Sequence, residues 1–237
     1  MKRSELETAL RPLVDTVGNR AWMRKFLTHP STMELYTSLT SEMHPARSGH
    51  PPCSIMFTSA VEGEGRTSIA TMFAVLSAAV ERNRRVLLVD ADTHRGTLGL
   101  MFGVAAEQPG LSEFCDGQAG VEECVTATGL PNLLVVPASR GAPAPVIFPP
   151  RRVEDFMREA SRSFDLVILD GPAGSSTRDV LSIARAVDRV AVVVRYGYAT
   201  RQQVSALIAE LVRVEADVIG TVLNQREYPL PRFLYGH

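Results

Sequence analysis

The chain has 237 residues, a formal net charge of -1 and 45% hydrophobic residues, which is enough to bury the core of one domain of ordinary size. Its charged start, and the lack of any run near the roughly 18 apolar residues of a membrane span, predict a cytoplasmic protein. The near-neutral charge argues against nucleic acid as a partner. Cys53, Cys115 and Cys124 lack a metal-ligand spacing and fit reduced thiols.

The order of apolar runs and breaks divides the chain into four parts. Residues 1–45 show helical spacing, with candidate helices near 5–17, 20–27 and 31–43, and residues 46–53 are a Pro- and Gly-rich linker. Residues 54–226 form the main domain and residues 227–237 a C-terminal tail. The expected strands are 54–59, 86–91, 133–137, 165–170, 189–194 and 218–224, and the expected helices of this domain are 67–82, 151–162, 177–186 and 201–214.

The alternation of strands and helices in the main domain predicts the α/β class. We expect a doubly wound, mostly parallel sheet with helices on both faces. In such sheets ligands bind outside the carboxyl ends of the strands, so polar residues at those ends carry the functional argument.

The segment 54–68 predicts a buried strand that runs into a phosphate-binding loop. Gly63 and Gly65 supply the flexible backbone whose N–H groups converge on phosphates, and Thr67 supplies a hydroxyl for Mg²⁺. The lysine expected before this threonine is replaced by Arg66, a bulkier and planar cation. Nucleotide binding is therefore expected, whereas phosphoryl transfer does not follow automatically.

Two further expected strands end in aspartates. Asp90 and Asp92 follow one apolar run and Asp170 follows another, as a carboxylate that holds Mg²⁺ at a strand tip requires. If the strand continues through them, Asp90 and Asp92 point to one side, so that one could bind metal while the other orients a nucleophile. Aspartates in these places also cap helices, which is the structural alternative.

Several motifs together carry a family resemblance. The segments 90–95, 110–114, 130–137, 164–172 and 220–224 resemble the bacterial tyrosine kinases of polysaccharide synthesis, the cytoplasmic partners of chain-length-determining membrane co-polymerases. The resemblance covers about residues 31–224 and includes the wider class of deviant Walker P-loop NTPases. It implies ATP or ADP and Mg²⁺ as cofactors, and a co-polymerase's cytoplasmic segment as the partner that holds the protein at the inner membrane.

The resemblance also implies roles for individual residues. Asp90 would lie near the metal or the attacking tyrosine, with Asp92 as its companion and Arg66 as the third catalytic position. Thr67 and Asp170 would hold Mg²⁺. Asn224 would recognise adenine, although an asparagine after a strand is equally a turn former. The residues that would surround the phosphates are Gly63, Glu64, Gly65, Arg66, Thr67 and Ser68.

The chain also departs from the family's pattern. A proline that usually precedes Gly63 is replaced by Glu62, which adds a negative charge near the phosphates unless it points to solvent. The helix that assembles subunit rings keeps Glu34, but both of its arginines are replaced, by Thr37 and Thr40. The phosphorylated tyrosine cluster of the tail is reduced to Tyr228 and Tyr235.

Three functions follow as alternatives. The first is a kinase-like regulatory subunit of an exopolysaccharide or capsule assembly and export machine, with weakened or lost kinase activity. The second is an active tyrosine autokinase of the same pathway, in which Arg66 replaces lysine. The third is a partition or positioning ATPase, which Val61 disfavours because it stands where those proteins have their signature lysine. A homo-oligomer is compatible with the first two.

Overall fold

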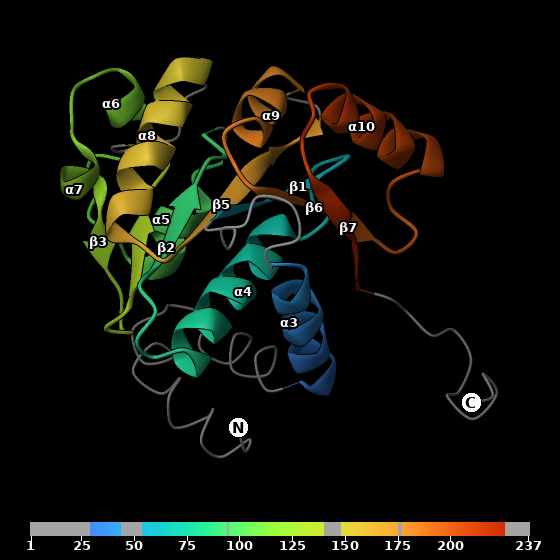
Figure 1. The fold of residues 1–237 in the computed structure, drawn as a ribbon, viewed down its shortest axis with the longest axis horizontal. Coiled ribbons are helices and arrows are strands. Elements are labelled where there is room, and N and C mark those ends of the chain that lie inside the picture. The colour runs from blue at the N-terminus through green and yellow to red at the C-terminus, as the bar shows by residue number, and fades with distance from the viewer. Residues whose placement is uncertain (1–28, 44–53, 94, 140–147, 175–176, 226–237) are drawn as a thin grey trace.

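The computed structural model describes residues 29–43, 54–93, 95–139, 148–174 and 177–225. These residues form a seven-stranded sheet in the order β3-β4-β2-β5-β1-β6-β7. All neighbouring strands run parallel except the short outer pair β3 and β4. Helices lie on both faces (Figure 1), so the predicted doubly wound, mostly parallel architecture is confirmed.

The strands and helices alternate along the chain, with three additional short helices before β3. The strands are β1 Ser54–Ser59, β2 Val86–Asp90, β3 Thr126–Ala127, β4 Leu133–Val136, β5 Leu166–Ala173, β6 Arg189–Arg195 and β7 Val218–Asn224. The helices are α3 Pro30–Glu42, α4 Arg66–Val80, α5 Thr97–Phe102, α6 Leu111–Cys115, α7 Val121–Cys124, α8 Pro150–Ser163, α9 Thr177–Ala184 and α10 Arg201–Arg213.

The predicted element bounds differ from the observed ones by at most three residues. The largest difference is in β5, which continues through Ala173 although the prediction ended it at Asp170. The segments α5, α6, α7 and β3 were not predicted, because they have six residues or fewer and hold too few turns to show a period. The candidate helices 5–17 and 20–27, the linker 46–53 and the tail 227–237 lie outside the described residues, so the domain limits stay predictions.

Two hydrophobic clusters lie on the two faces of the sheet. The first cluster joins α3, α4 and α5 to one face, and the second joins α6 to α10 to the other. Strands β1, β2 and β5 are buried at every position, which explains the apolar runs 55–57, 86–89 and 166–169 within them. Strand β7 is more exposed, as expected for an edge strand. The carboxyl ends of the central strands are thereby held in place by packing on both sides.

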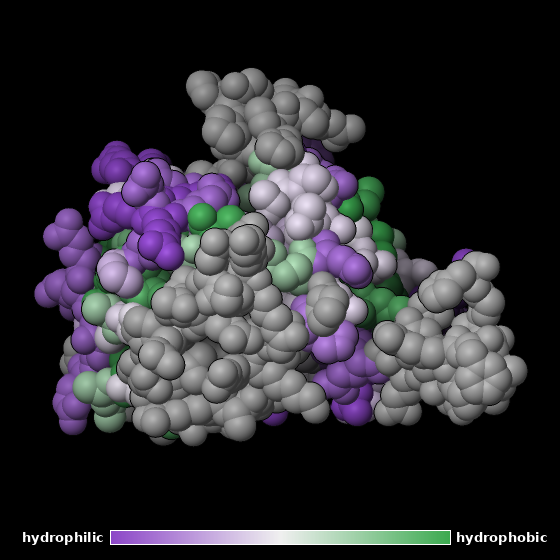
Figure 2. Space-filling model, turned by 90° about the horizontal axis from the view of Figure 1, so that it is seen from below, coloured by the Kyte–Doolittle hydropathy of each residue, from purple (hydrophilic) through white to green (hydrophobic). Residues whose placement is uncertain are grey.

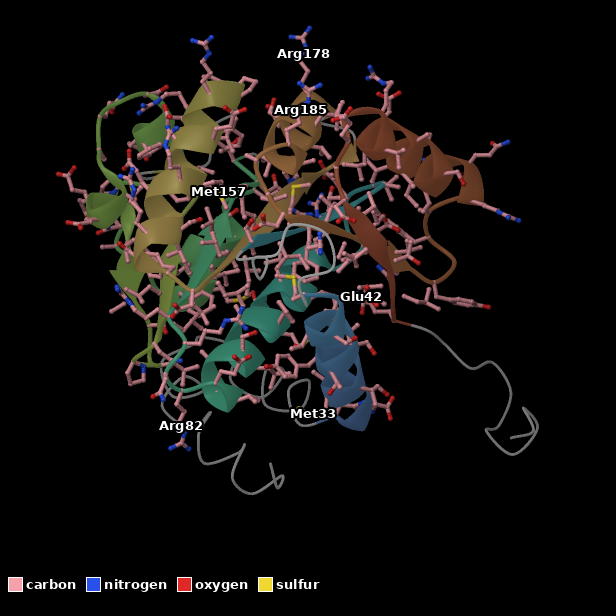
Figure 3. The ribbon with its side chains drawn as sticks, in the orientation of Figure 1. Met33, Glu42, Arg82, Met157, Arg178 and Arg185 are labelled. Carbon is pink, nitrogen blue, oxygen red and sulfur yellow. The ribbon has the colours of Figure 1, made fainter. Side chains whose placement is uncertain are left out.

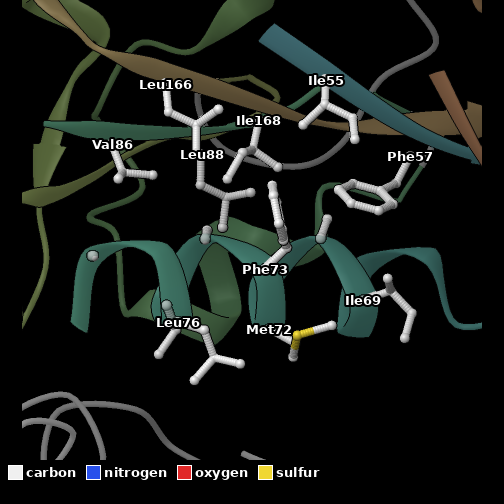
Figure 4. Packing of buried hydrophobic residues seen from close by; sticks show 14 of the residues in the cluster. Ile55, Phe57, Ile69, Met72, Phe73, Leu76, Val86, Leu88, Leu166 and Ile168 are labelled. Carbon is white, nitrogen blue, oxygen red and sulfur yellow. The ribbon is translucent and has the colours of Figure 1, made fainter. Parts of the chain in front are cut away.

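Helix α4 is the main support of the first face. Phe73 points from α4 toward Ile168 and Phe57 of the sheet (Figure 4). Its ring centroid lies 5.8 Å from that of Phe57 and 5.8 Å from that of Tyr36 in α3. One aromatic side chain thus joins the sheet, the helix that follows the phosphate loop, and α3.

The outer surface mixes polar and apolar residues. On the face seen in Figure 2, the hydrophobic areas of the described residues lie between hydrophilic ones, as is usual for the outside of a globular domain. Among the described helices, none has the length and apolar content needed to span a membrane.

We predict that Phe73→Ala lowers the free energy of unfolding by about 3–5 kcal/mol, because it removes a fully buried aromatic ring and leaves a cavity. Urea unfolding followed by circular dichroism measures this change. Val212→Ala is the control, since Val212 is 60% exposed and its truncation should cost less than about 0.5 kcal/mol. A loss below about 1 kcal/mol for Phe73→Ala would contradict the role given to this side chain.

Candidate functional site

The phosphate loop connects the end of β1 to the start of α4. Gly63 and Gly65 have φ angles of +81° and +90°, in the left-handed region that glycine adopts without strain. At Gly65 the space is also closed, because a Cβ would lie 2.1 Å from Nδ2 of Asn224. The two glycines predicted to give the loop its shape are therefore favoured by backbone angle at both positions, and a side chain at Gly65 would also displace the Asn224 amide.

The first turn of α4 presents backbone N–H groups at the end of this loop. Helix α4 begins at Arg66, so Thr67 and Ser68 lie in its first turn, where backbone N–H groups have no partner within the helix. Both residues are partly exposed. The N–H groups and the positive end of the helix dipole together favour an anion.

Arg66 and Asp92 form a buried ion pair at the site. Nη2 of Arg66 donates to Oδ2 of Asp92 at 2.9 Å, and the two side chains are 4% and 9% exposed. Other arginines, such as Arg82 and Arg178, point away from the body of the molecule (Figure 3). Nη1 of Arg66 is buried and has no hydrogen-bond partner among the described residues. One terminal nitrogen of the cation at the lysine position is therefore paired with Asp92, and the other is unpaired among the described residues.

Asp90 is held by the backbone that follows it. Its Oδ1 accepts from the backbone N of Asp92 at 3.1 Å, and its Oδ2 from the N of Leu98 at 2.8 Å. Burial, together with the charge of Asp170, raises the pKa of Asp90 well above its usual range. Strand β2 ends at Asp90. Asp90 and Asp92 were expected to point to one side only if the strand continued through both, and it does not. Instead, the side chain of Asp90 binds the backbone of Asp92.

Asp170 is a buried carboxylate without a matched donor. It lies within β5 beside Asp90, three residues before the end of the strand, so the expectation of a strand tip was wrong. Neither of its oxygens meets a donor with hydrogen-bond geometry among the described residues. Burial raises its pKa to about 7, although the Thr67 hydroxyl and the charge of Arg66 both lower it.

These orphaned atoms provide a test of whether Mg²⁺ and phosphate fit the site. A carboxylate with two buried, unpartnered oxygens next to a threonine hydroxyl matches the oxygen ligands that Mg²⁺ takes. An unpartnered buried N–H of Arg66 matches a phosphate oxygen. Thr67 and Asp170 thus fit the metal, and Arg66 retains one donor for an anion.

Glu64 and Asn224 make hydrogen bonds within the protein. The Glu64 side chain is fully buried and accepts hydrogen bonds from the backbone N of Val61 and of Arg195, both at 3.1 Å. Asn224 donates from Nδ2 to the carbonyl oxygen of Glu64 at 2.9 Å. The adenine role of Asn224 stays a prediction. By contrast Glu62 is exposed, so its charge meets solvent.

Two further residues, which the sequence did not predict as site residues, lie against the loop. The backbone N of Arg195 binds Glu64, and the ring of Tyr198 lies under the Arg195 guanidinium at 5.1 Å. Oη of Tyr198 lies 3.2 Å from where a Cβ of Gly63 would be. The available signal was their position directly after a predicted strand, at the sheet edge where ligands bind.

The three positions that the family resemblance links to ring assembly lie on α3. Glu34 and Thr37 are exposed, and Thr40 is half-buried. The Thr37 hydroxyl donates to the carbonyl of Met33 one turn earlier, so it is satisfied within its own helix. His94 lies outside the described residues.

The sequence comparisons find tyrosine kinases. No protein-family model matches the chain. The tyrosine-protein kinase CpsD of Streptococcus agalactiae is 28% identical over 172 residues, which is 72% of this chain and 74% of CpsD. The tyrosine-protein kinase etk of Escherichia coli K12 is 27% identical over 195 residues, which is 82% of this chain but only 26% of etk.

The structure comparisons find the same fold in two groups of proteins. The kinase domain of the Escherichia coli tyrosine kinase ETK is 24% identical, with a TM-score of 0.69 over 84% of this chain and 78% of that one. The BceF tyrosine kinase domain is 27% identical, with a TM-score of 0.67 over 81% and 75%. The septum site-determining protein MinD of Pyrococcus horikoshii, complexed with Mg-ADP, is 23% identical, with a TM-score of 0.61 over 76% and 74%.

The buried carboxylate of Asp170 predicts a pH dependence of stability. Its pKa is about 7 in the folded chain and about 4 in an unfolded one, so between these values the folded state binds more protons. Its contribution to stability is then fully present below about pH 4 and is lost as the pH rises through about 7. In metal-free buffer at pH 8 we expect Asp170→Asn to stabilise the chain by about 2–4 kcal/mol.

Urea unfolding at pH 5 and pH 8 measures this effect, and Asp116→Asn is the control because Asp116 is exposed. We expect the gain from Asp170→Asn to shrink at pH 5, where the wild-type carboxyl is protonated. An equal effect at both pH values would show that Asp170 does not titrate in this range.

Proposed function

We propose that this chain, whose relatives are bacterial tyrosine-protein kinases and whose fold is that of their kinase domains, is a kinase-like subunit that binds Mg-nucleotide and transfers phosphate weakly or not at all. By the resemblance of its motifs, it acts as a regulatory or scaffolding part of a polysaccharide assembly and export machine. The observation that carries the proposal is the buried ion pair between Arg66 and Asp92.

The ion pair weakens the two groups that phosphoryl transfer needs most. A cation at the loop position neutralises charge that develops on the transferred phosphoryl group, and it must be free to reach that group. Here the guanidinium is held by Asp92 through Nη2, and Nη1, which is unpaired among the described residues, is left for a phosphate. Asp92 is in turn neutralised by Arg66, so it is less able to orient a tyrosine nucleophile.

The remaining residues retain the binding part of the site. Thr67 and Asp170 would hold Mg²⁺, which when bound shields the negative charge of the phosphates. The glycines of the loop and the first turn of α4 would hold the phosphates themselves. Asp90 orients the segment between β2 and α5 through its two backbone hydrogen bonds. Binding is thereby separated from transfer.

The proposed partner is the cytoplasmic segment of a membrane co-polymerase. Because the resemblance includes this association, the protein would act in the cytoplasm at the inner membrane. Helix α3 offers Thr37 in place of one arginine of the family's ring contact, and Thr37 is exposed but satisfied by Met33. We therefore propose that the chain depends on its partner more than on rings of its own copies.

An active autokinase is the second candidate. It is favoured by the two unpartnered oxygens of Asp170 and by Nη1 of Arg66, which together leave one metal ligand and one phosphate donor in place. A positioning ATPase has no such support, because the likeness to MinD is one of fold alone and Val61 replaces the signature lysine.

We predict that the purified chain binds fluorescent ADP in the presence of Mg²⁺ and loses most of this binding when EDTA is added. Incubated with labelled ATP, it should form no phosphotyrosine alone and little with the cytoplasmic segment of its co-polymerase. Fluorescence titration measures the binding and anti-phosphotyrosine blotting the transfer. Robust phosphotyrosine on the unmodified chain would favour the autokinase, and absence of any Mg-dependent nucleotide binding would contradict the proposal.

Arg66→Lys is the companion variant. Lysine is a compact point charge with three rotatable donors, so it can turn fully toward the transferred phosphate, whereas the planar guanidinium is held at Nη2 by Asp92. We expect phosphotyrosine formation to rise at least about tenfold, equivalent to about 1.4 kcal/mol of barrier. Arg82→Lys is the matched control, because Arg82 is exposed and lies outside the loop. A response of Arg66→Lys no larger than that of Arg82→Lys would show that Arg66 is not the limiting group.

A further inference from the structure

Glu64 is a charged side chain at the centre of the phosphate loop, yet it is 0% exposed. Its Oε2 accepts from the backbone N of Val61 within the loop, and its Oε1 accepts from the backbone N of Arg195 at the end of β6. One carboxylate thus spans from the loop to a strand that comes about 130 residues later in the chain. No neutral side chain of this size offers two equivalent acceptor oxygens.

The backbone of Glu64 is held as well. Its carbonyl oxygen accepts from Nδ2 of Asn224 at 2.9 Å, at the end of β7. The same amide nitrogen closes the space beside Gly65, where a Cβ would lie 2.1 Å away. Because Arg195 and Asn224 pair in register on the neighbouring strands β6 and β7, both contacts come from one corner of the sheet.

A third contact reaches the loop from this corner. Tyr198 is half-exposed and its Oη lies 3.2 Å from the Cβ position of Gly63. Its ring lies beneath the guanidinium of Arg195, and its backbone N donates to the carbonyl of Arg195 at 3.2 Å. The end of β6 and the turn after it therefore lie beside two successive loop residues: Arg195 binds the buried carboxylate of Glu64, and Tyr198 lies next to Gly63 at the surface.

These contacts hold residues 63–65 of the loop, which precede α4. The first turn of α4 determines where the N–H groups of Arg66 and Thr67 point. Gly63 and Gly65 have wide conformational freedom on either side of Glu64 and, without a further contact, would leave the intervening N–H groups unaligned. Oriented N–H groups hold a phosphate only if their directions are set in advance.

We infer that Glu64 is a positioning residue, which aligns the phosphate loop by tying it to the ends of β6 and β7 and so determines its affinity for a nucleotide diphosphate. This inference rests on the proposed function, because it assigns the loop a nucleotide. It adds to the expectation that Glu64 is one of the residues around the phosphates: its carboxylate accepts from the backbone N of Val61 and of Arg195, and its carbonyl oxygen accepts from Nδ2 of Asn224.

The test is Glu64→Gln, with Glu62→Gln as the matched control two residues away in the same loop. The amide group keeps one acceptor oxygen but turns a donor toward one of the two backbone N–H groups. Amide hydrogen exchange, measured by NMR without nucleotide, should speed up at least about tenfold at Val61 or Arg195, whichever N–H then faces the amide nitrogen, while the amides of β2 and β5 stay protected. Glu62→Gln should leave all of them unchanged, since Glu62 is exposed.

Nucleotide affinity provides the second readout. Glu64→Gln should weaken binding of Mg-ADP about tenfold, and binding of AMP much less, because only the diphosphate reaches across the whole loop. A loss that is equal for both nucleotides, or none for either, would overturn the positioning role. If the β2 and β5 amides also exchange faster, Asn224→Ala replaces the variant and should speed exchange in residues 63–66 alone.

The two proposals fail separately. If the unmodified chain binds no Mg-nucleotide, the proposed function is wrong, and the exchange rates of Val61 and Arg195 still decide whether Glu64 holds the loop. If the chain binds nucleotide but the Glu64→Gln variant has the same amide exchange rates and the same affinity for Mg-ADP as the Glu62→Gln variant, the positioning role is wrong and the proposed function stands.

Discussion

The ion pair between Arg66 and Asp92 is the interaction on which the proposed chemistry depends. It joins the start of α4 to the segment after β2 inside the site, where its two side chains are 4% and 9% exposed. Removing one partner of such a pair would leave a buried charge without compensation, which makes the arrangement hard to break. The Arg66 guanidinium, which phosphoryl transfer needs at the phosphate, is therefore stabilised beside Asp92 instead. Binding of a nucleotide and transfer of its terminal phosphate need not fail together.

The site is held from two sides with different chemistry. On the side of β2 and β5, carboxylates are crowded and buried, so that the pKa of Asp170 rises to about 7 and that of Asp90 rises well above its usual range. On the side of β6 and β7, the carboxylate of Glu64 is satisfied by backbone N–H groups and supports the loop. The first side retains the orphaned oxygens that suit Mg²⁺, and the second fixes the glycine-rich backbone that suits phosphate.

Much of this fold was predictable from the sequence, because short apolar runs in the buried strands β1, β2 and β5 (55–57, 86–89 and 166–169) alternate with segments of helix length. The places of the glycine-rich loop and of the three aspartates at one edge of the sheet were predictable from their positions after apolar runs, whereas their roles toward a nucleotide stay predictions. The partners of these residues were not predictable. The Arg66–Asp92 pair, and the contact of Glu64 with Arg195 131 residues away, depend on which strands become neighbours, and local spacing carries no such information. The short helices α5 to α7 were not predicted because each is too short to show a helical period in the sequence.

A structure of the chain with Mg²⁺ and a non-hydrolysable ATP analogue would test the central claim most directly. The account predicts that Nη2 of Arg66 stays within hydrogen-bond distance of Asp92 while the metal lies between Thr67, Asp170 and the phosphates. A guanidinium that has left Asp92 and grips the terminal phosphate with both of its terminal nitrogens would contradict the account, because the cation would then be available for transfer.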